Sequence, residues 1–382
     1  MNTTKYQLGE LITQRREKNS ETDLPIRGVS KDGFIPPKQI DADTSIYNVF
    51  YMGDFVFNPA RMELNSIAFN DKYEKAICSS LYEVFYVHRT DIILPEYLAL
   101  IVKQNWFTRY CEFLGQGSAR EYCRFANISE IAIDVPPMDE QRKAVNSSKV
   151  ITERIELKRR INDNLEAQAL ALFEEQFASA YSASDLPEGW RKQRLDTICT
   201  VKGGKRLPAD AELLDDPTEH PYIRVRDVGA SRYVCLTDQF QYIDDETHQA
   251  IARYIVDTDD IVISIVGTIG LIGKIHSTLN KANLTENCVR LTGVKGVTPD
   301  YLYYTLCMKK NNREIELLTV GAVQAKLPMY NIQSIDIIIP PDDLIRRFQD
   351  RMDIFNSQIE ANSLETQRLE ELRNVLLAKI SD

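Results

Sequence analysis

The sequence has few of the residues and spacings that mark metal sites, disulfide frameworks or membrane spans. Its 382 residues include only four histidines, and none stands at metal-ligand spacing from another histidine or a cysteine. The seven cysteines form no CxxC pair and are odd in number, which favours reduced, mostly buried thiols. No apolar run reaches the length of a membrane span. We therefore expect a chain without a bound metal and without a transmembrane helix.

Motifs of nucleotide and methyl-transfer chemistry are also missing. The glycine-rich stretch at 266–274, VGTIGLIGK, has Thr268 where a phosphate-binding loop needs glycine, and Ile275 where it needs serine or threonine. No GxGxxG follows a first strand. Asn58 and Pro59 are followed by alanine and arginine, whereas the tetrapeptide of amino-methyltransferases continues with proline and an aromatic residue that stacks on a flipped base. We therefore expect no catalytic site in this chain.

Length and composition limit the architecture. With 43% hydrophobic residues the chain can bury two ordinary cores. The first ten residues, MNTTKYQLGE, lack the charged and then apolar order of a signal peptide, so we expect a cytoplasmic protein.

One unit of sequence occurs twice. SEIAIDVPPMDEQRK at 129–143 matches QSIDIIIPPDDLIRR at 333–347, and each predicts an apolar strand that stops at two prolines before a charged helix begins. The same shift, from 129 to 333, also aligns Gly117 with Gly321 and Ile155-Glu156 with Ile359-Glu360. A period this long indicates two domains, each followed by a helix, and not a solenoid.

The two repeated helices are long and amphipathic. Apolar residues recur at spacings of three and four, with polar residues such as Asn162 and Thr366 in the seam, as in an imperfect coiled coil. A small domain cannot cover helices near forty residues, so antiparallel pairing is favoured over two independent helices, each packed on its own domain. The predicted α+β fold has a first domain at 1–137 with one helix near 96–110, a central helix at 138–182, a second domain at 183–341 and a C-terminal helix at 342–382.

Basic and polar residues gather in the loops between the expected strands. Arginine and lysine neutralise phosphates or read guanine, asparagine or glutamine can pair with adenine, and glycine lets a backbone approach a surface closely. A charged loop is equally often only solvated, so both interpretations stay open for each residue. The candidate DNA-binding residues are Arg27, Lys31, Asn58, Arg61, Asn65, Arg120, Arg124, Lys205, Arg206, Arg224, Arg226, Thr268, Lys274, Gln324 and Lys326.

The net charge of −10 argues against a DNA-binding protein, because such proteins are usually basic. Much of the acid lies in DAELLDDPTEH, DDETHQ and VDTDD and along the helices, away from the basic loops. Local charge decides where a phosphate docks. We therefore expect weak binding by the chain alone and help from a basic partner.

Six motifs follow one another in a fixed order along the chain: NPARMELNSIAF at 58–69, LPEGW at 186–190, GGKRLP at 203–208, YIRVRDVG at 222–229, GAVQAKLPMYNIQSIDIIIPP at 321–341 and LEELRNVLLAKI at 369–380. This order resembles the specificity subunit of type I restriction-modification systems. The first domain departs from the pattern, because it lacks the LPEGW opening and has GSAREYCRF where the second has GAVQAKLP.

The resemblance implies a subunit without catalysis or a cofactor of its own, whose two target-recognition domains each read one half of a split, asymmetric site in double-stranded DNA. The paired helices would act as a ruler and dock two methyltransferase subunits, which bind S-adenosylmethionine and methylate adenine. Motor-nuclease restriction subunits would join them to cleave unmodified phage DNA. The candidate partner-binding residues are Ile155, Leu165, Leu172, Ile359, Leu369 and Leu376.

Two other functions stay open. One is a coiled-coil adaptor that joins proteins without binding nucleic acid. The other is an enzyme whose site matches no familiar motif.

Overall fold

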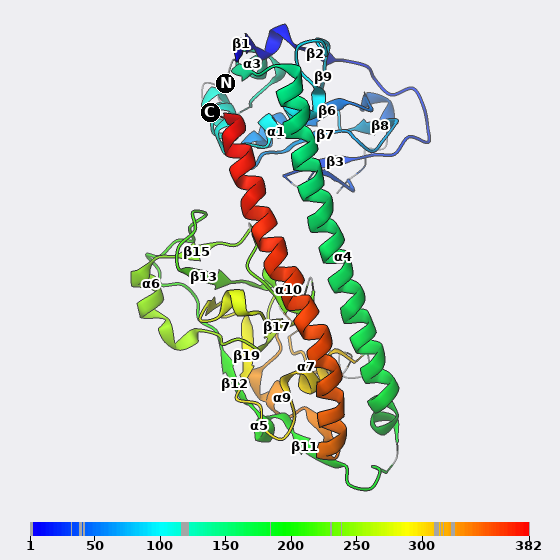
Figure 1. Ribbon diagram of the computed structural model, residues 1–382, viewed down its shortest axis with the longest axis vertical. Helices are drawn as coiled ribbons and strands as arrows, with labels where there is room; N and C mark the ends of the chain where they lie inside the picture. The colour runs from blue at the N-terminus through cyan, green and yellow to red at the C-terminus, as the bar shows by residue number, and fades with distance from the viewer. Residues whose placement is uncertain are drawn as a thin grey trace. The chain divides into compact units, whose positions relative to one another are not determined.

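The computed structural model describes residues 3–31, 33–37, 40, 43–115, 122–183, 185–229, 231–237, 239–308, 313, 315, 317–321 and 325–381. They form two compact units, one of Met1–Glu153 with Glu371–Asp382 and one of Arg154–Glu370. Figure 1 labels the elements of both units.

The first unit is built on a four-stranded antiparallel sheet. Its order is β2 (Ile12–Arg15), β9 (Glu83–Val87), β6 (Asp54–Phe57) and β7 (Ile67–Phe69). Two-stranded antiparallel sheets accompany it, β1 (Thr4–Gln7) with β10 (Ala132–Val135), β3 (Gly28–Ser30) with β4 (Gly33–Ile35), and β5 (Asn48–Tyr51) with β8 (Lys75–Cys78). The rings of Phe55 and Phe85 stack in the core with centroids 4.8 Å apart.

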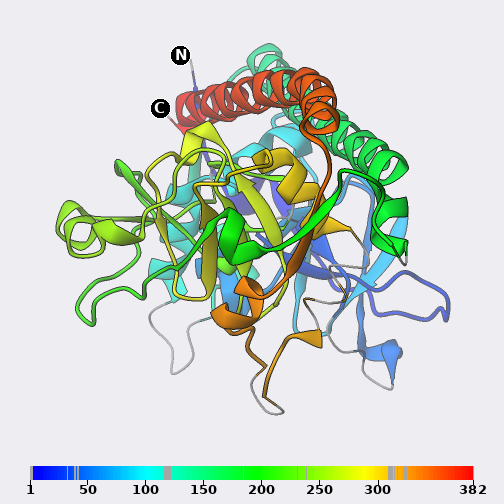
Figure 2. The ribbon, with the colours of Figure 1, turned by 90° about the horizontal axis from the view of Figure 1, so that it is seen from below.

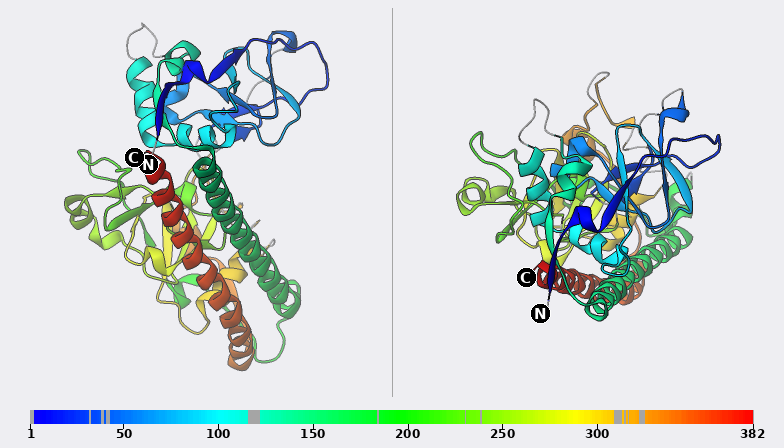
Figure 3. Two further views of the ribbon diagram at one scale, coloured as in Figure 1. Left: turned by 45° about the horizontal axis from the view of Figure 1, so that its top comes forward. Right: turned by 90° about the horizontal axis from the view of Figure 1, so that it is seen from above.

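Short helices complete the core of the first unit. They are α1 (Pro95–Val102), α2 (Asn105–Gly115), α3 (Phe125–Ser129) and the 3-10 turns η1 (Leu8–Glu10), η2 (Thr44–Ile46) and η3 (Pro59–Leu64). Leu98, Ile101 and Phe107 share one buried cluster with the sheet, and Figure 3 shows α1 and α2, in cyan, beside these strands. The last turn of the long C-terminal helix adds Ile380 to this cluster.

We expected one helix over 96–110, and the structure has two. The break falls after Val102, whose carbonyl oxygen accepts a hydrogen bond from Asn65 Nδ2 at 3.0 Å. Asn65 Nδ2 also lies 2.6 Å from Thr108 Oγ1 in the second helix. The side chain of Asn65 therefore links both helices across the break, a tertiary contact that a local pattern cannot reveal.

The second unit repeats this plan with longer loops. Its main sheet has the order β12 (Thr200–Gly203), β19 (Cys288–Thr292), β16 (Ile261–Ser264), β17 (Ile272–Ile275) and β14 (Tyr233–Val234). A second sheet joins β15 (Tyr242–Ile243), β13 (His220–Ile223) and β18 (Asn283–Leu284), while β11 (Arg191–Arg194) pairs with β20 (Asp336–Ile339). The helices here include α5 (Leu195–Ile198), α6 (Asp245–Ala250), α7 (Pro299–Cys307) and α9 (Met329–Gln333).

The strand orders confirm the predicted duplication. The series β2-β9-β6-β7 matches β12-β19-β16-β17, and the pair β1–β10 matches β11–β20. The registers of the central hairpins also agree, because Phe55 lies opposite Phe69 in the first unit as Ile261 lies opposite Lys274 in the second. Both units are therefore versions of one fold.

The two predicted long helices are present as α4 (Met138–Ser182) and α10 (Asp342–Ser381). Within the second unit they run antiparallel, because Phe173 packs on Phe348 while Asn162 Oδ1 accepts a hydrogen bond from Asn362 Nδ2 at 2.8 Å (Figure 1). The seam buries Ile155 and Ile359 beside this polar pair. Polar seam residues fix the register of a helix pair at some cost in stability, so the imperfect coiled coil is confirmed.

Charged residues flank the seam. Arg154 and Lys158 both pair with Glu365, and Arg159 Nη2 lies 2.6 Å from Glu370 Oε1. Farther along, the rings of Phe173 and Phe177 pack against Tyr301 of α7. The helix pair and the sheet thus share one core in the second unit.

The structure adds three observations on membranes, metals and thiols. No helix among the described residues is long and apolar enough to cross a membrane. Within the same residues, no group of three or more His, Cys, Asp or Glu side chains is placed to hold a metal ion. The seven cysteines are unpaired and five of them are buried.

Candidate nucleic-acid interface

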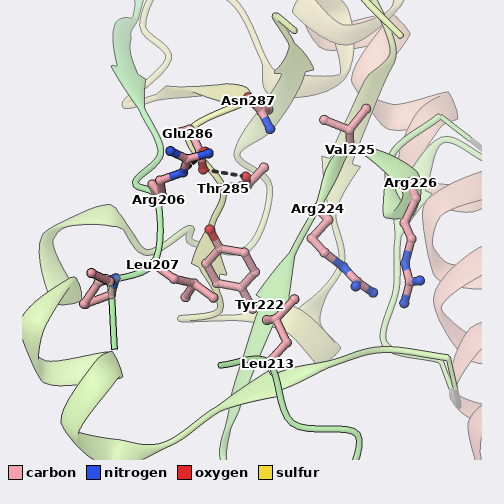
Figure 4. A pocket seen from close by; sticks show the side chains of 12 residues that line it. Arg206, Leu207, Leu213, Tyr222, Arg224, Val225, Arg226, Thr285, Glu286 and Asn287 are labelled. Carbon is pink, nitrogen blue, oxygen red and sulfur yellow. Dashed lines mark hydrogen bonds and ion pairs between the residues drawn. The ribbon is translucent and has the colours of Figure 1, made fainter. Parts of the chain in front are cut away.

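Three candidate arginines of the second unit line one depression of about 730 Å³. Arg206 follows strand β12, while Arg224 and Arg226 follow strand β13. Figure 4 shows Arg206 on one side of the Tyr222 ring and the other two arginines on the other side. The remaining lining residues are Leu207, Pro208, Ala209, Leu213, Val225, Thr285, Glu286 and Asn287. Positive side chains around an apolar floor suit a ligand with phosphates at its edge and flat or methyl-bearing groups at its centre.

A glycine shapes the wall of this depression. A Cβ atom on Gly204 would lie 2.0 Å from the carbonyl oxygen of Thr285 and 2.4 Å from that of Leu284. The backbone of Lys205 also donates a hydrogen bond to Leu284 at 2.8 Å. The second glycine of the GGKRLP motif, Gly204, therefore allows the loop after β12 to lie directly on the end of β18.

Acidic neighbours restrain the arginines to different degrees. Arg206 is 84% exposed and its Nε lies 3.2 Å from Glu286. Arg224 is mostly buried, donates to Gln241 and lies 3.6 Å from Asp227. Arg226 lies 3.5 Å from Asp227 and donates to the carbonyl of Gln239 at 3.0 Å. Arg206 is thus the most accessible of the three.

The carboxylate of Asp227 lies beside both Arg224 and Arg226, and its pKa is shifted. Burial raises its pKa to about 6, although the charge of Arg226 opposes this rise. Two cations bound to one partly buried carboxylate keep excess positive charge at this edge of the depression. Tyr222 at the floor donates its hydroxyl to the carbonyl of Lys205 at 2.8 Å, and burial raises its pKa.

A second group of candidates lies near the β16–β17 turn. Thr268 is exposed in this turn, which has positive φ angles at Gly267 and Gly270. Lys326 is exposed and its backbone forms bridges with Val266 and Val320. The structure therefore brings the GTIG turn and the Lys326 loop together. The candidate Lys205 is also exposed, with its Nζ 5.9 Å from the ring centroid of Tyr254.

Lys274 was expected on a loop surface, but the structure places it inside the fold. It lies in strand β17 with its side chain 4% exposed. Its Nζ lies 2.6 Å from Asp300 and 2.7 Å from Asp259. The pattern GTIGLIGK made this lysine look like part of the turn, whereas the turn ends before Ile272.

Among the described residues of the first unit, the exposed candidate arginines are Arg61 and Arg124. Arg61 lies exposed in η3, and its side chain has no hydrogen-bond or ion-pair partner among the described residues. The side chain of Arg124 is 64% exposed, with Nη1 3.5 Å from Glu83 and its guanidinium 5.4 Å from the ring centroid of Tyr122. The amide of Cys123 donates to the carbonyl of Pro59 at 3.0 Å, which brings the two arginine segments together.

The other described candidates of this unit serve the fold or stand apart. Arg27 Nε donates to Tyr73 at 2.7 Å, and Asn58 caps η3 by accepting from the amide of Ala60. Asn65 is 8% exposed and adopts the left-handed conformation at the end of η3. Lys31 is exposed, and its carbonyl accepts from Lys103 at 2.7 Å. Arg120 and Gln324 lie outside the described residues.

The candidate partner-binding residues on the long helices differ in how deeply they are buried. Ile155 and Ile359 are buried in the seam, and Leu172 packs against the core of the second unit. Leu165, Leu369 and Leu376 are half-buried. Large apolar side chains that we did not single out are exposed instead, at Val150, Leu157, Ile161, Ile354, Leu364, Leu372 and Val375. Spacing finds the apolar side chains of a helix, but only the structure separates the seam from the outer face.

The sequence also did not reveal most of the lining of the depression. Thr285, Glu286 and Asn287 come from the loop after β18 and meet Arg206, about eighty positions earlier, only in the folded chain. Their one local signal is the polar stretch LTEN at 284–287. That signal is common to solvated turns.

Known proteins share these features. The model of the type I restriction modification DNA specificity domain matches residues 45–167 and 187–374, more than half of the chain. The type I restriction enzyme MjaIX specificity subunit of Methanocaldococcus jannaschii is 22% identical over 310 residues, which cover 76% of this chain and 69% of that protein. The type I restriction enzyme HindI specificity subunit of Haemophilus influenzae is 20% identical over 367 residues, which cover 76% of this chain and 77% of that protein.

One crystal structure has a comparable fold. It is that of the type I restriction-modification system S subunit from M. genitalium, which is 17% identical. The match covers 100% of this chain and 96% of that chain, with a TM-score of 0.51. At this identity the likeness concerns the fold alone.

Proposed function

Because the chain belongs to the type I restriction modification DNA specificity family, and is the non-catalytic DNA specificity subunit of such a system, we propose a division of labour among its parts. Each unit reads one half of a split DNA site. The two long helices set the distance between the half-sites and dock the subunits that carry the catalysis.

The observation that carries this proposal is one scaffold with two different sets of loops. The strand orders of the two units agree, yet Arg206 and Arg226 border the depression of the second unit, while Arg61 and Arg124 are exposed candidate arginines of the first. Bases are read by side chains at loop tips and grooves, while phosphate contacts position the protein. Two units that share strands but not loops should therefore read unlike half-sites.

The helices supply the length and the surface for the second role. Helix α4 contains 45 residues, which corresponds to about 68 Å at a rise of about 1.5 Å per residue. Within the second unit, Leu157 on α4 and Leu364 on α10 are 50% and 36% exposed, outside the buried seam. Exposed apolar side chains on a helix suit a protein partner. We assign this surface to two methyltransferase subunits, which hold S-adenosylmethionine and methylate adenine in the cytoplasm, and to restriction subunits that join them.

DNA binding with and without the methyltransferase subunits tests the proposal. A labelled random DNA library is incubated with the chain alone, with the subunits alone and with both. We expect selection of a bipartite sequence only by the combination, because the acidic chain binds phosphates weakly by itself. If no mixture selects a sequence, the result favours an adaptor that does not bind nucleic acid. If the mixture selects one continuous motif, the result contradicts the proposal that each unit reads a separate half-site.

A further inference from the structure

Buried charges join the recognition sheet of the second unit to the long helices. The side chains of Arg232, Lys274 and Asp300 are 0%, 4% and 2% exposed. Arg232 directly precedes β14, Lys274 lies in β17 and Asp300 lies in the first turn of α7. None of the three can contact DNA in this arrangement, so their role lies within the subunit.

Asp300 is the hub of this network. Its Oδ1 accepts hydrogen bonds from Arg232 Nη2 and, at 2.6 Å, from Lys274 Nζ. Its Oδ2 accepts from Gln349 Nε2 at 2.9 Å and from Asn356 Nδ2 at 2.6 Å, and both of these residues lie on α10. One carboxylate therefore holds two cations of the recognition sheet and two amides of the helix.

Arg232 extends the network to both long helices. Its Nη1 donates to Asn356 Oδ1 on α10 and to Tyr304 Oη on α7, each at 2.9 Å. Its backbone amide donates to Glu166 Oε2 on α4 at 2.7 Å. The segment before β14 is thus fixed to α4, α7 and α10 at once.

A second contact lies one helical turn farther along α10. Glu360 accepts a hydrogen bond from Ser277 Oγ at 2.5 Å, and its other oxygen lies 2.6 Å from Nε2 of His276. Residues 349, 356 and 360 are spaced by seven and four, so they share one face of α10. The buried apolar side chains of Ile359 and Met352 lie beside this polar row, within three or four residues of its members. Figure 2 shows the sheet of the second unit lying along α10.

The first unit has no such hub at the equivalent places. Glu96 occupies the position of Asp300 at the repeat offset, and it is exposed. Phe69 occupies the register position of Lys274 and packs in the apolar core. The network is therefore not a requirement of the shared fold but an addition to the second unit.

We propose that Asp300, with Arg232 and Lys274, is a positioning joint that holds the second recognition sheet in one orientation on the helix pair and thereby restricts the spacer that the complex accepts. The inference rests on the proposed function. Directional hydrogen bonds among buried charges define one geometry, whereas apolar contacts alone tolerate sliding and rotation. The joint affects the length of the spacer between the half-sites, whereas the loops determine which bases are recognised.

The test is methylation mapping in cells that express the chain with its methyltransferase subunits. Asp300→Asn keeps the shape of the side chain and removes its charge. We expect unchanged half-sites and about a tenfold rise in the fraction of methylation at sites whose spacer is one base pair shorter or longer. A milder double variant, Gln349→Ala with Asn356→Ala, removes only the helix amides and should give the same change if Asp300→Asn fails to fold.

The matched control is Asp260→Asn. Asp260, which directly precedes β16, pairs with Arg290 of β19 at 3.1 Å and is 6% exposed, and among the described residues the pair has no hydrogen bond or ion pair to the long helices. We expect this variant to lower methylation without widening the spacer. The proposal would be overturned if folded variants of the joint methylated only sites with the parent spacer length. It would also be overturned if Asp260→Asn broadened the range of spacer lengths as much as the joint variants do. A parent chain that yields no bipartite motif would instead contradict the proposed function.

Discussion

At one register position of the shared hairpin, the first unit has an apolar side chain and the second unit has a charged one. In the first unit Phe55 faces Phe69 across β6 and β7, and the long helix is attached through the neutral Gln141, whose Nε2 donates to the carbonyls of Ile92 and Pro136 at 2.8 Å. In the second unit Ile261 faces Lys274, which is bound to a buried carboxylate. A shared strand order therefore does not imply a shared way of attaching the sheet to the helix.

One feature of the hairpin is nevertheless common to both. Asp54 in the first unit and Asp260 in the second are buried at equivalent places, and each is paired with an arginine. Those arginines, Arg15 and Arg290, lie on non-equivalent strands, β2 and β19. Both units thus contain a paired carboxylate at this turn, but its arginine comes from the adjacent strand β19 in the second unit and from β2, one strand farther away, in the first.

The largest expected effect comes from removing the hub of the second unit. Asp300→Ala would leave Arg232 and Lys274 buried with too few acceptors, at a cost of about 3 to 5 kcal/mol in the free energy of unfolding. The equivalent change in the first unit, Glu96→Ala, should cost less than about 0.5 kcal/mol because Glu96 is exposed. Urea denaturation of the full chain measures both, and equal losses would remove the distinction between the units.

The seam should respond alike on both helices. Ile155→Ala and Ile359→Ala each remove a buried side chain, 2% and 1% exposed, from equivalent positions of the repeat. We expect each to lower the free energy of unfolding by about 2 to 5 kcal/mol. Leu157→Ala, at an exposed position, is the control and should have little effect. A large loss from only one of the two isoleucines would mean that the helices do not contribute equally to the seam.

Substitutions in the loops of one unit should impair recognition of one half-site and leave the other half-site unaffected. Arg206→Ala or Arg226→Ala should weaken recognition of one half-site by about 1 to 3 kcal/mol where a base is read, and Arg61→Ala or Arg124→Ala should affect only the other. Competition binding of the assembled complex against half-site variants measures this effect. Arg194→Ala is the control, since Arg194 ends β11 outside the depression and pairs with Asp196 of α5. Loss at both half-sites from one substitution would contradict separate reading.

The smallest expected effect is a pH dependence confined to the second unit. Burial raises the pKa of Glu166 to about 7, with Arg232 acting in the opposite direction. The folded chain therefore binds this proton more tightly than the unfolded chain, so the contribution to stability is complete below about pH 4.5 and is lost as the pH rises through about 7. Burial opposes the charged form of Asp300, but Arg232 and Lys274 outweigh it and hold the pKa of this carboxyl well below its usual value, so Asp300 stays charged throughout this window.

Glu166→Gln isolates this contribution. The variant should show less loss of stability than the parent between pH 4.5 and 7, by about 1 to 2 kcal/mol in the free energy of unfolding. Urea denaturation across this pH range provides the measurement. Parallel pH profiles for parent and variant would show that Glu166 does not titrate as its burial predicts.

The repeated architecture could be predicted from the sequence because its signals are local and occur twice. The proline pairs at 136–137 and 340–341 separate each strand from its long helix, and α4 begins at the predicted Met138. Lys274 and Asn65 could not be placed, because their burial depends on partners at Asp300 and Val102. The depression escaped prediction since it joins three segments that are far apart in the chain.

The central claim is that two units read separate half-sites at a distance set by the long helices. Its most direct test is methylation mapping after four residues are inserted into both helices, after Glu156 in α4 and after Arg368 in α10. The insertion lengthens the pair by about 6 Å. We predict the same two half-sites with a spacer longer by about one or two base pairs, at roughly 34 to 36 Å per helical turn of DNA. An unchanged spacer with normal methylation would contradict this account.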